Sequence, residues 1–148
     1  MNLRKIYNID KDVEIKNVRT NSKLVEPGDL FVCIKGATVD RHDFIDEAIK
    51  SGASAVIVTK DIENKSVPII KVDDIDKEYI KLCKEIYDNP QDKLKIIGVT
   101  GTDGKTSTTT IIQTLLGNDT CGYIGTNGMY SSKVKRDNPN TTPAPDLL

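Results

Sequence analysis

A glycine-rich segment, residues 98–107, carries the clearest chemical signal in the chain. It reads Gly-Val-Thr-Gly-Thr-Asp-Gly-Lys-Thr-Ser and lies between an apolar run over 94–99 and a helix-like run over 106–116. Glycines let backbone N–H groups approach phosphate oxygens closely, and the first turn of a helix adds partial positive charge. A strand, this loop and a helix, in that order, predict a site that binds the phosphates of a nucleotide.

Two side chains of this loop have the types needed for phosphate chemistry. We expect Lys105 to reach the outer phosphates as the catalytic cation, and the Thr106 hydroxyl to bind Mg²⁺. The loop is shorter than the common Gly-x-x-x-x-Gly-Lys-Thr pattern, because Val99 stands where the first glycine belongs. A plain turn with a solvated lysine remains the alternative. The predicted nucleotide-binding set is Gly101, Thr102, Asp103, Gly104, Lys105, Thr106 and Ser107.

The first part of the chain alternates strand-like and helix-like patterns. Its apolar runs predict strands over 29–35, 53–59 and 67–72, and its periodic runs predict helices over 43–51 and 74–87. We interpret the pair Asp73 and Asp74 as the start of the second helix. The β–α–β alternation predicts an α/β fold with parallel pairing.

A polar, proline-containing segment over 88–93 predicts a domain boundary, with one domain over 1–90 and a second over 91–148. The second domain should hold a strand over 94–99, the loop, a helix over 106–116 and a strand over 120–125. The apolar residues expected to form the inner face of its helix are Ile111, Ile112, Leu115 and Leu116. Residues 126–148 are rich in Asn, Ser, Pro and Thr and are expected to be loop. These elements are too few for a doubly wound nucleotide domain, so we expect an incomplete one.

Several segments resemble the Mur ligases, which build the peptide of peptidoglycan, and in particular their tripeptide-forming MurE branch. The glycine-rich loop resembles their ATP loop, which folylpolyglutamate synthases share. Residues 21–32 read Asn-Ser-Lys-Leu-Val-Glu-Pro-Gly-Asp-Leu-Phe-Val and are similar to a Mur ligase segment. Further matches in the same order lie at 34–36, 40–45, 48–53, 123–126 and 140–143. The resemblance covers nearly the whole chain.

The resemblance implies a small substrate-binding domain followed by the start of a doubly wound, P-loop ATPase domain. It implies ATP-driven amide formation, in which a substrate carboxylate is phosphorylated and then attacked by the third amino acid. The substrate would be UDP-N-acetylmuramoyl-L-Ala-D-Glu, with ATP and Mg²⁺ as cofactors. The residues that match its binding positions are Thr20, Ser22, Ala37, Thr38, Val39, Asn140, Thr141 and Thr142.

The chain departs from the resembled pattern at four positions. Asn21 and Lys23 replace an Asp and an Arg, Arg41 replaces a Gly, and Asp103 replaces the Asn between Thr and Gly of the ATP loop. Loss of an Arg removes a planar, bidentate fork, so we expect these changes to alter affinity. His42 is the only histidine, and we expect it to pack at a helix entry rather than to act as a base.

Composition excludes several other classes of protein. The chain has 148 residues, 37% of them hydrophobic and 29% charged, with a formal net charge of −1. This balance gives no electrostatic basis for binding nucleic acid or a membrane surface. No apolar run approaches the ~20 residues that span a bilayer, and the first residues do not form a signal peptide. Three scattered cysteines predict free thiols, and hence a protein of the reducing cytoplasm. The sequence does not determine the oligomeric state, for which we expect a monomer.

Three interpretations of the function remain open. The leading one is a truncated tripeptide-forming ligase, without turnover of its own because its remaining metal-binding and amino-acid-binding groups would lie beyond Leu148. A folate-type ligase shares the loop, but the segment 21–32 counts against it. A non-catalytic nucleotide-binding or regulatory module derived from such a ligase is the third.

Overall fold

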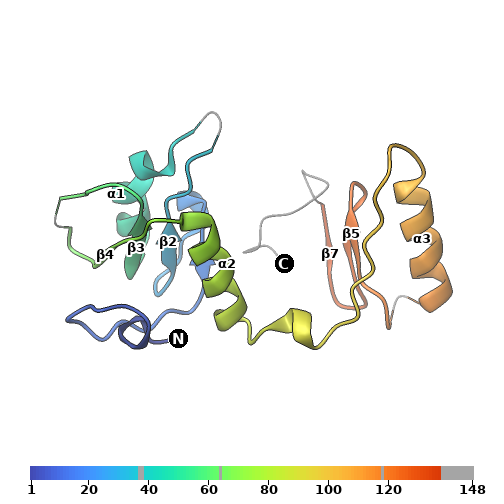
Figure 1. Cartoon of the computed structure of the whole chain (residues 1–148), viewed down its shortest axis with the longest axis horizontal. Helices are drawn as coiled ribbons and strands as arrows, with labels where there is room; N and C mark the ends of the chain where they lie inside the picture. Colours follow the sequence, from blue (N-terminus) through green and yellow to red (C-terminus); the bar gives the residue numbers. More distant parts are fainter. Residues whose placement is uncertain (37–38, 64, 118, 138–148) are drawn as a thin grey trace. The chain divides into compact units, whose positions relative to one another are not determined.

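The chain forms two compact units, Met1–Lys93 and Leu94–Leu148, in a computed structural model (Figure 1). The structure describes residues 1–36, 39–63, 65–117 and 119–137. In this part of the chain, no helix is long and apolar enough to cross a membrane.

The first unit is built on a four-stranded parallel sheet. Its strands are β1 (Val18–Arg19), β2 (Leu30–Val32), β3 (Ala55–Val58) and β4 (Ile69–Lys71), in the order β1-β2-β3-β4. The register pairs Leu30 with Ala55 and Val56 with Ile69. The predicted α/β fold with parallel pairing is therefore confirmed, with strands shorter than predicted and with β1 in addition.

The sheet is covered on both faces, as parallel sheets usually are. Every residue of β2 and β3 is buried, and Phe31 and Leu82 are among the largest side chains with no exposed surface. Helix α1 (Ile45–Lys50) packs against two short 3-10 turns, η2 (Ser22–Leu24) and η3 (Arg41–Phe44), while helix α2 (Ile75–Ile86) contacts β1. A further 3-10 turn, η1 (Leu3–Lys5), lies near the N-terminus.

The helix predicted over 43–51 is divided into η3 and α1 in the structure. The Asp40 side chain accepts the His42 N–H and so starts the 3-10 turn η3 before α1 begins.

Local chemistry explains the ends of α2. The Asp74 side chain accepts the Lys77 N–H at 3.0 Å and caps the first turn, which confirms the interpretation of the acidic pair as a helix start. Asp88 and Asn89 then adopt positive φ values of 56° and 48°, which end the helix before η4 (Pro90–Asp92). The face that α2 buries consists of Ile75, Tyr79, Leu82 and Cys83.

The second unit differs from the prediction at its start. Residues 94–99 form no strand, and Leu94, Ile96 and Ile97 are 60–73% exposed. A strand needs a hydrogen-bonded neighbour, and the described residues of this unit offer none to this segment. Helix α3 (Lys105–Leu116) forms as predicted and contacts β5, but it has no buried residue, so the predicted inner face is wrong.

The second unit also contains more sheet than predicted. Strands β5 (Tyr123–Gly125), β6 (Gly128–Tyr130) and β7 (Lys135–Arg136) form an antiparallel sheet, so the prediction of loop after residue 125 is wrong for β6 and β7. Gly128 has a φ of +116° after the two-residue turn, and the rings of Tyr123 and Tyr130 lie 5.9 Å apart across the strands. Turn chemistry and an aromatic cross-strand pair together explain the hairpin.

The three cysteines have different environments. All are free thiols; Cys33 and Cys83 are buried in the first unit, and Cys121 is partly exposed in the second.

Gly52 provides a direct test of the packing between α1 and the turn before β2. Its φ is +108°, and an added Cβ would lie 2.9 Å from the Cα of Pro27. We predict that Gly52→Ala lowers the free energy of unfolding of the first unit by about 1–3 kcal/mol, measured by chemical denaturation. Gly98→Ala is the matched control, because nothing lies within 4 Å of its added Cβ. Equal stability of the two variants would contradict this packing argument.

Candidate functional site

The carboxyl ends of the parallel strands form the first candidate site. Ligands of open α/β sheets bind beyond these ends, where the loops of neighbouring strands meet. Thr20 and Ser22 follow β1, Val39 follows β2, and Lys60 follows β3. Three predicted substrate residues therefore follow strands that end at one edge of the sheet. Ala37 and Thr38 lie outside the described residues.

Thr20 and Ser22 are held in place by contacts with Arg41 and Glu47 that the sequence analysis did not predict. Thr20 and Ser22 are both buried, with 7% and 6% exposure. The Thr20 carbonyl accepts a hydrogen bond from Nη1 of Arg41, and the Ser22 hydroxyl donates to Oε2 of Glu47 at 2.7 Å. The substitution of Arg41 for a Gly was the one sequence signal that drew attention to this contact.

Asp40 joins the turn after β2 to the end of β3. Its Oδ1 lies 2.6 Å from Nδ1 of His42, and its Oδ2 accepts a hydrogen bond from Nζ of Lys60 at 2.5 Å. The His42 Nε2 accepts the Thr59 N–H at 3.2 Å, so the ring hydrogen belongs on Nδ1. The Lys60 ammonium, followed by the two His42 hydrogen bonds, holds the pKa of the Asp40 carboxyl well below its usual range. His42 thus has the packing role expected of it, because both ring nitrogens are engaged.

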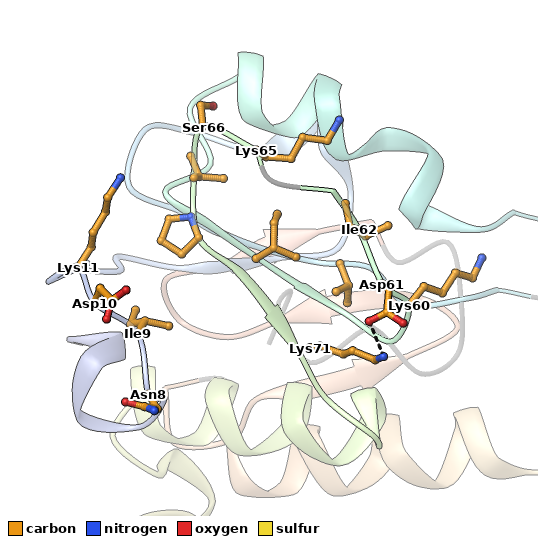
Figure 2. Close-up of a pocket in the computed structure, with 14 residues that line it drawn as sticks. Asn8, Ile9, Asp10, Lys11, Lys60, Asp61, Ile62, Lys65, Ser66 and Lys71 are labelled. Atoms are coloured by element: carbon orange, nitrogen blue, oxygen red, sulfur yellow. Dashed lines mark hydrogen bonds and ion pairs between the residues drawn. The ribbon is translucent and has the colours of Figure 1, made fainter.

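A separate pocket of about 480 Å³ lies along the edge strand β4 (Figure 2). Residues 8–11 form one side, and the segment between β3 and β4 forms the other. Figure 2 shows Lys71 reaching Asp61, which it contacts at 2.6 Å. Lys60 and Lys65, which also line the pocket, pair with Asp40 and Asp46. Among the described residues, none of the predicted site residues lines this pocket.

The glycine-rich loop of the second unit forms the second candidate site. Helix α3 starts at Lys105, and its N-cap is Gly104, which has a φ of +74° and provides no side-chain cap. The first backbone N–H groups of the helix therefore lack the acceptor that a capping side chain would supply. No atom lies within 4 Å of a Cβ added at Gly104. This open, N–H-lined surface fits a phosphate group.

Lys105 and Asp103 are placed differently in the loop. The Lys105 ammonium donates to the carbonyls of Gly101 and Thr102, the latter at 3.2 Å, and so folds over the loop. Asp103 is exposed, and its carboxylate accepts no hydrogen bond from the described residues. The Asp103 side chain therefore does not cap α3.

The structure brings the predicted nucleotide-binding residues together at the start of α3. Thr106 lies in the first turn, partly buried, beside Lys105. Among the described residues, no group of three His, Cys, Asp or Glu side chains could hold a metal ion. A Mg²⁺ ion here would rely on the Thr106 hydroxyl, water and the phosphates of the nucleotide, which is how Mg²⁺ is commonly bound. Asn140, Thr141 and Thr142 lie outside the described residues.

Comparison with known families matches both units. The model described as "Mur ligase family, catalytic domain" matches residues 14–89, and that of the "Mur ligase middle domain" matches residues 99–148. The chain belongs to the Mur ligase family. The resemblance inferred from the sequence motifs is confirmed.

Several curated relatives of this Mur ligase chain, similar to it in sequence, are diaminopimelate-adding ligases. It is 42% identical over 137 residues to the UDP-N-acetylmuramoyl-L-alanyl-D-glutamate–2,6-diaminopimelate ligase of Clostridium perfringens, covering 90% of this chain and 28% of the relative. It is 39% identical over 133 residues to UDP-N-acetylmuramyl-tripeptide synthetase 2 of Oceanobacillus iheyensis, covering 86% and 27%. The chain therefore spans less than a third of the length of these relatives.

Solved structures of Mur ligases share the fold. The MurF ligase of Thermotoga maritima in complex with ADP matches with a TM-score of 0.57 and 38% identity, over 72% of this chain and 24% of that one. A UDP-N-acetylmuramoyl-L-alanyl-D-glutamate–2,6-diaminopimelate ligase matches with a TM-score of 0.71 over 99% of this chain and 31% of that one. At 22% identity, the second match bears on the fold alone.

The Asp40 network predicts a defined dependence of stability on pH. Because the pKa of Asp40 is lowered in the folded state, its ionised form stabilises the fold above the unfolded carboxyl pKa of about 3.9. We predict that Asp40→Asn is less stable than the wild type at pH 7, and that the difference shrinks as the pH falls below about 4. Denaturant titrations across this range measure it.

Asp43→Asn is the matched control, because Asp43 is exposed on the same turn and forms no ion pair among the described residues. Its stability should follow the wild type at every pH. A loss of stability in Asp40→Asn that is as large at pH 3 as at pH 7 would contradict the ionic origin of the effect.

Proposed function

We propose that this chain is the substrate-binding and phosphate-binding part of an ATP-dependent peptide ligase of peptidoglycan precursor synthesis. The ligase would add the third amino acid to UDP-N-acetylmuramoyl-L-Ala-D-Glu, and the names of several relatives specify 2,6-diaminopimelate. The observation that carries the proposal is the uncapped, glycine-lined start of α3 with Lys105 folded over it, in a chain about 40% identical to such ligases.

The first unit would bind the UDP-linked substrate at the carboxyl ends of its strands. Thr20 and Ser22 lie after β1, and the short loop with Ala37, Thr38 and Val39 follows β2. The location at this edge of a parallel sheet supports the assignment, since ligands of such sheets gather there. Asn140, Thr141 and Thr142 would contact the substrate near the nucleotide.

The second unit would bind ATP with Mg²⁺. ATP supplies the phosphoryl group that activates the substrate carboxylate. The backbone N–H groups at the start of α3 would hold phosphate oxygens, Lys105 would offset their negative charge, and the Thr106 hydroxyl would join the coordination of Mg²⁺. The protein's contribution is positioning and charge neutralisation.

Exposed apolar side chains in the second unit support a larger domain around it. Leu94, Ile96 and Ile97 precede the loop, and Leu115 is 80% exposed on α3. Burying such side chains is worth about 1.5–3 kcal/mol each, so we propose that further strands and helices of a full-length ligase cover them. We also propose that the whole protein is a cytoplasmic monomer.

Titration with UDP tests the assignment of the first unit. We predict that UDP shifts backbone amide NMR signals around Thr20, Ser22 and Val39 while leaving α2 unaffected. Ser22→Ala should weaken UDP binding about tenfold by removing a hydroxyl at the site. Ser51→Ala, directly after the C-terminal end of α1, is the matched control and should bind UDP normally. Absence of any shift at millimolar UDP in a folded sample would exclude this binding site.

Calorimetry with Mg·ATP tests the loop. An ionised Asp103 at ~5 Å from a phosphate charge, with an effective dielectric of about 20, costs roughly 3 kcal/mol before screening by water and Mg²⁺. We predict that Asp103→Asn tightens Mg·ATP binding and that Lys105→Ala weakens it. Asp119→Asn, an exposed change outside the loop, should have no effect. If Asp103→Asn binds Mg·ATP no better than the wild type, the repulsion argument fails and the carboxylate has a favourable role.

A further inference from the structure

Arg41 places a cation at the carboxyl ends of β1 and β2. It is the first residue of η3, and its Nη1 donates to the carbonyl of Thr20, which directly follows β1. Its charge also reaches Cys33, which directly follows β2: burial and Asp40 raise the pKa of the Cys33 thiol to about 12, and Arg41 acts in the opposite direction. The guanidinium therefore lies where the loops after both strands begin.

This cation has no opposite charge among the described residues. Arg41 is partly buried and takes part in no ion pair with them. Asp40, which precedes Arg41 in the chain, binds Lys60 and His42, and Glu47 accepts the Ser22 hydroxyl. Asp43, on the same turn, is exposed to solvent and forms no ion pair with Arg41. The Cys33 thiol stays protonated at neutral pH because of its raised pKa. A partly desolvated guanidinium without a counter-charge favours the binding of an anion.

The backbone that carries Arg41 is held firmly. Asp40 caps η3 by accepting the His42 N–H at 3.1 Å, and the buried His42 ring accepts the Thr59 N–H after β3. A guanidinium has five N–H donors, and the hydrogen bond to Thr20 uses one of them. The remaining donors suit the paired oxygens of a phosphate group.

We propose that Arg41 binds the diphosphate of the nucleotide-linked substrate and thereby helps to set the affinity of the first unit for it. This inference rests on the proposed function, in which a UDP-linked compound occupies the same edge of the sheet. It assigns to Arg41 a role that Gly, which stands at this position in the resembled pattern, has no side chain to perform. The alternative is a purely structural role, in which Arg41 only fixes the Thr20 carbonyl.

Three probes separate these roles in the full chain: UDP, uridine and inorganic pyrophosphate, each titrated by calorimetry. We expect Arg41→Gln to weaken UDP and pyrophosphate binding by about tenfold or more, and to leave uridine binding within about twofold. Arg41→Lys keeps the charge but not the planar fork, so its affinity for UDP and pyrophosphate should lie between those of the wild type and Arg41→Gln. Arg4→Gln is the matched control, because Arg4 is exposed and paired with Asp12 at 3.2 Å. The NMR signal of the Arg41 side-chain Nε should shift with pyrophosphate and not with uridine.

The outcomes distinguish this proposal from the proposed function. If Arg41→Gln loses affinity for UDP and uridine equally, Arg41 has only a structural role and the proposal is overturned. Unchanged UDP affinity in a folded Arg41→Gln variant would overturn it as well. Arg41-dependent pyrophosphate binding without any uridine or UDP preference would support the anion site and count against the UDP-linked substrate. Failure of the wild type to bind either UDP or pyrophosphate would overturn both.

Discussion

Parallel pairing of four strands is the constraint on which the first unit depends. Parallel neighbours cannot be joined by a tight turn, so each connection must leave one end of the sheet and return to the other. The returning segments bury both faces of β2 and β3 and bring the loops after β1, β2 and β3 to a common edge. The hydrogen bonds of Asp40, His42, Arg41 and Glu47 all tie these loops to one another or to α1. The site is thus a consequence of strand direction, refined by polar contacts.

The second unit differs, because the conformation of its glycine-rich loop is set by local contacts. Positive φ angles at Gly101 and Gly104 set the turn, and Lys105 fixes it through two carbonyls of the loop itself. Helix α3 gains little from packing, and the hydroxyls of Thr110 and Thr114 bond to carbonyls one turn earlier, at 2.8 Å each. Such bonds do not strengthen a helix. Residues 101–104 are exposed and α3 has no buried residue, so the loop adopts its conformation without support from a packed core.

The sequence predicted those features that depend on neighbouring residues, and it failed to predict those that depend on contacts between distant segments. The cap at Asp74 and the spacing of Ile75, Tyr79 and Leu82 predicted α2 nearly to the residue, and the glycine pattern predicted the start of α3. The strand over 94–99 was wrong because apolar residues indicate only a readiness to pair, and pairing needs a neighbour. Strands β6 and β7 were missed because they are only three and two residues long and lie in a segment rich in Asn, Ser, Pro and Thr. The contacts of Arg41 with Thr20 and of Glu47 with Ser22 join residues more than 20 positions apart, and no local pattern encodes them.

The uneven burial of the three cysteines gives the two units different chemical reactivity. Cys33 and Cys83 are shielded in the first unit, and burial raises the pKa of Cys33 so far that little thiolate forms at neutral pH. Cys121, partly exposed between α3 and β5, is the accessible thiol. A maleimide fluorophore added to the unmodified protein will therefore attach mainly to Cys121, beyond the C-terminal end of α3, giving the second unit its own optical reporter while the first unit stays unlabelled.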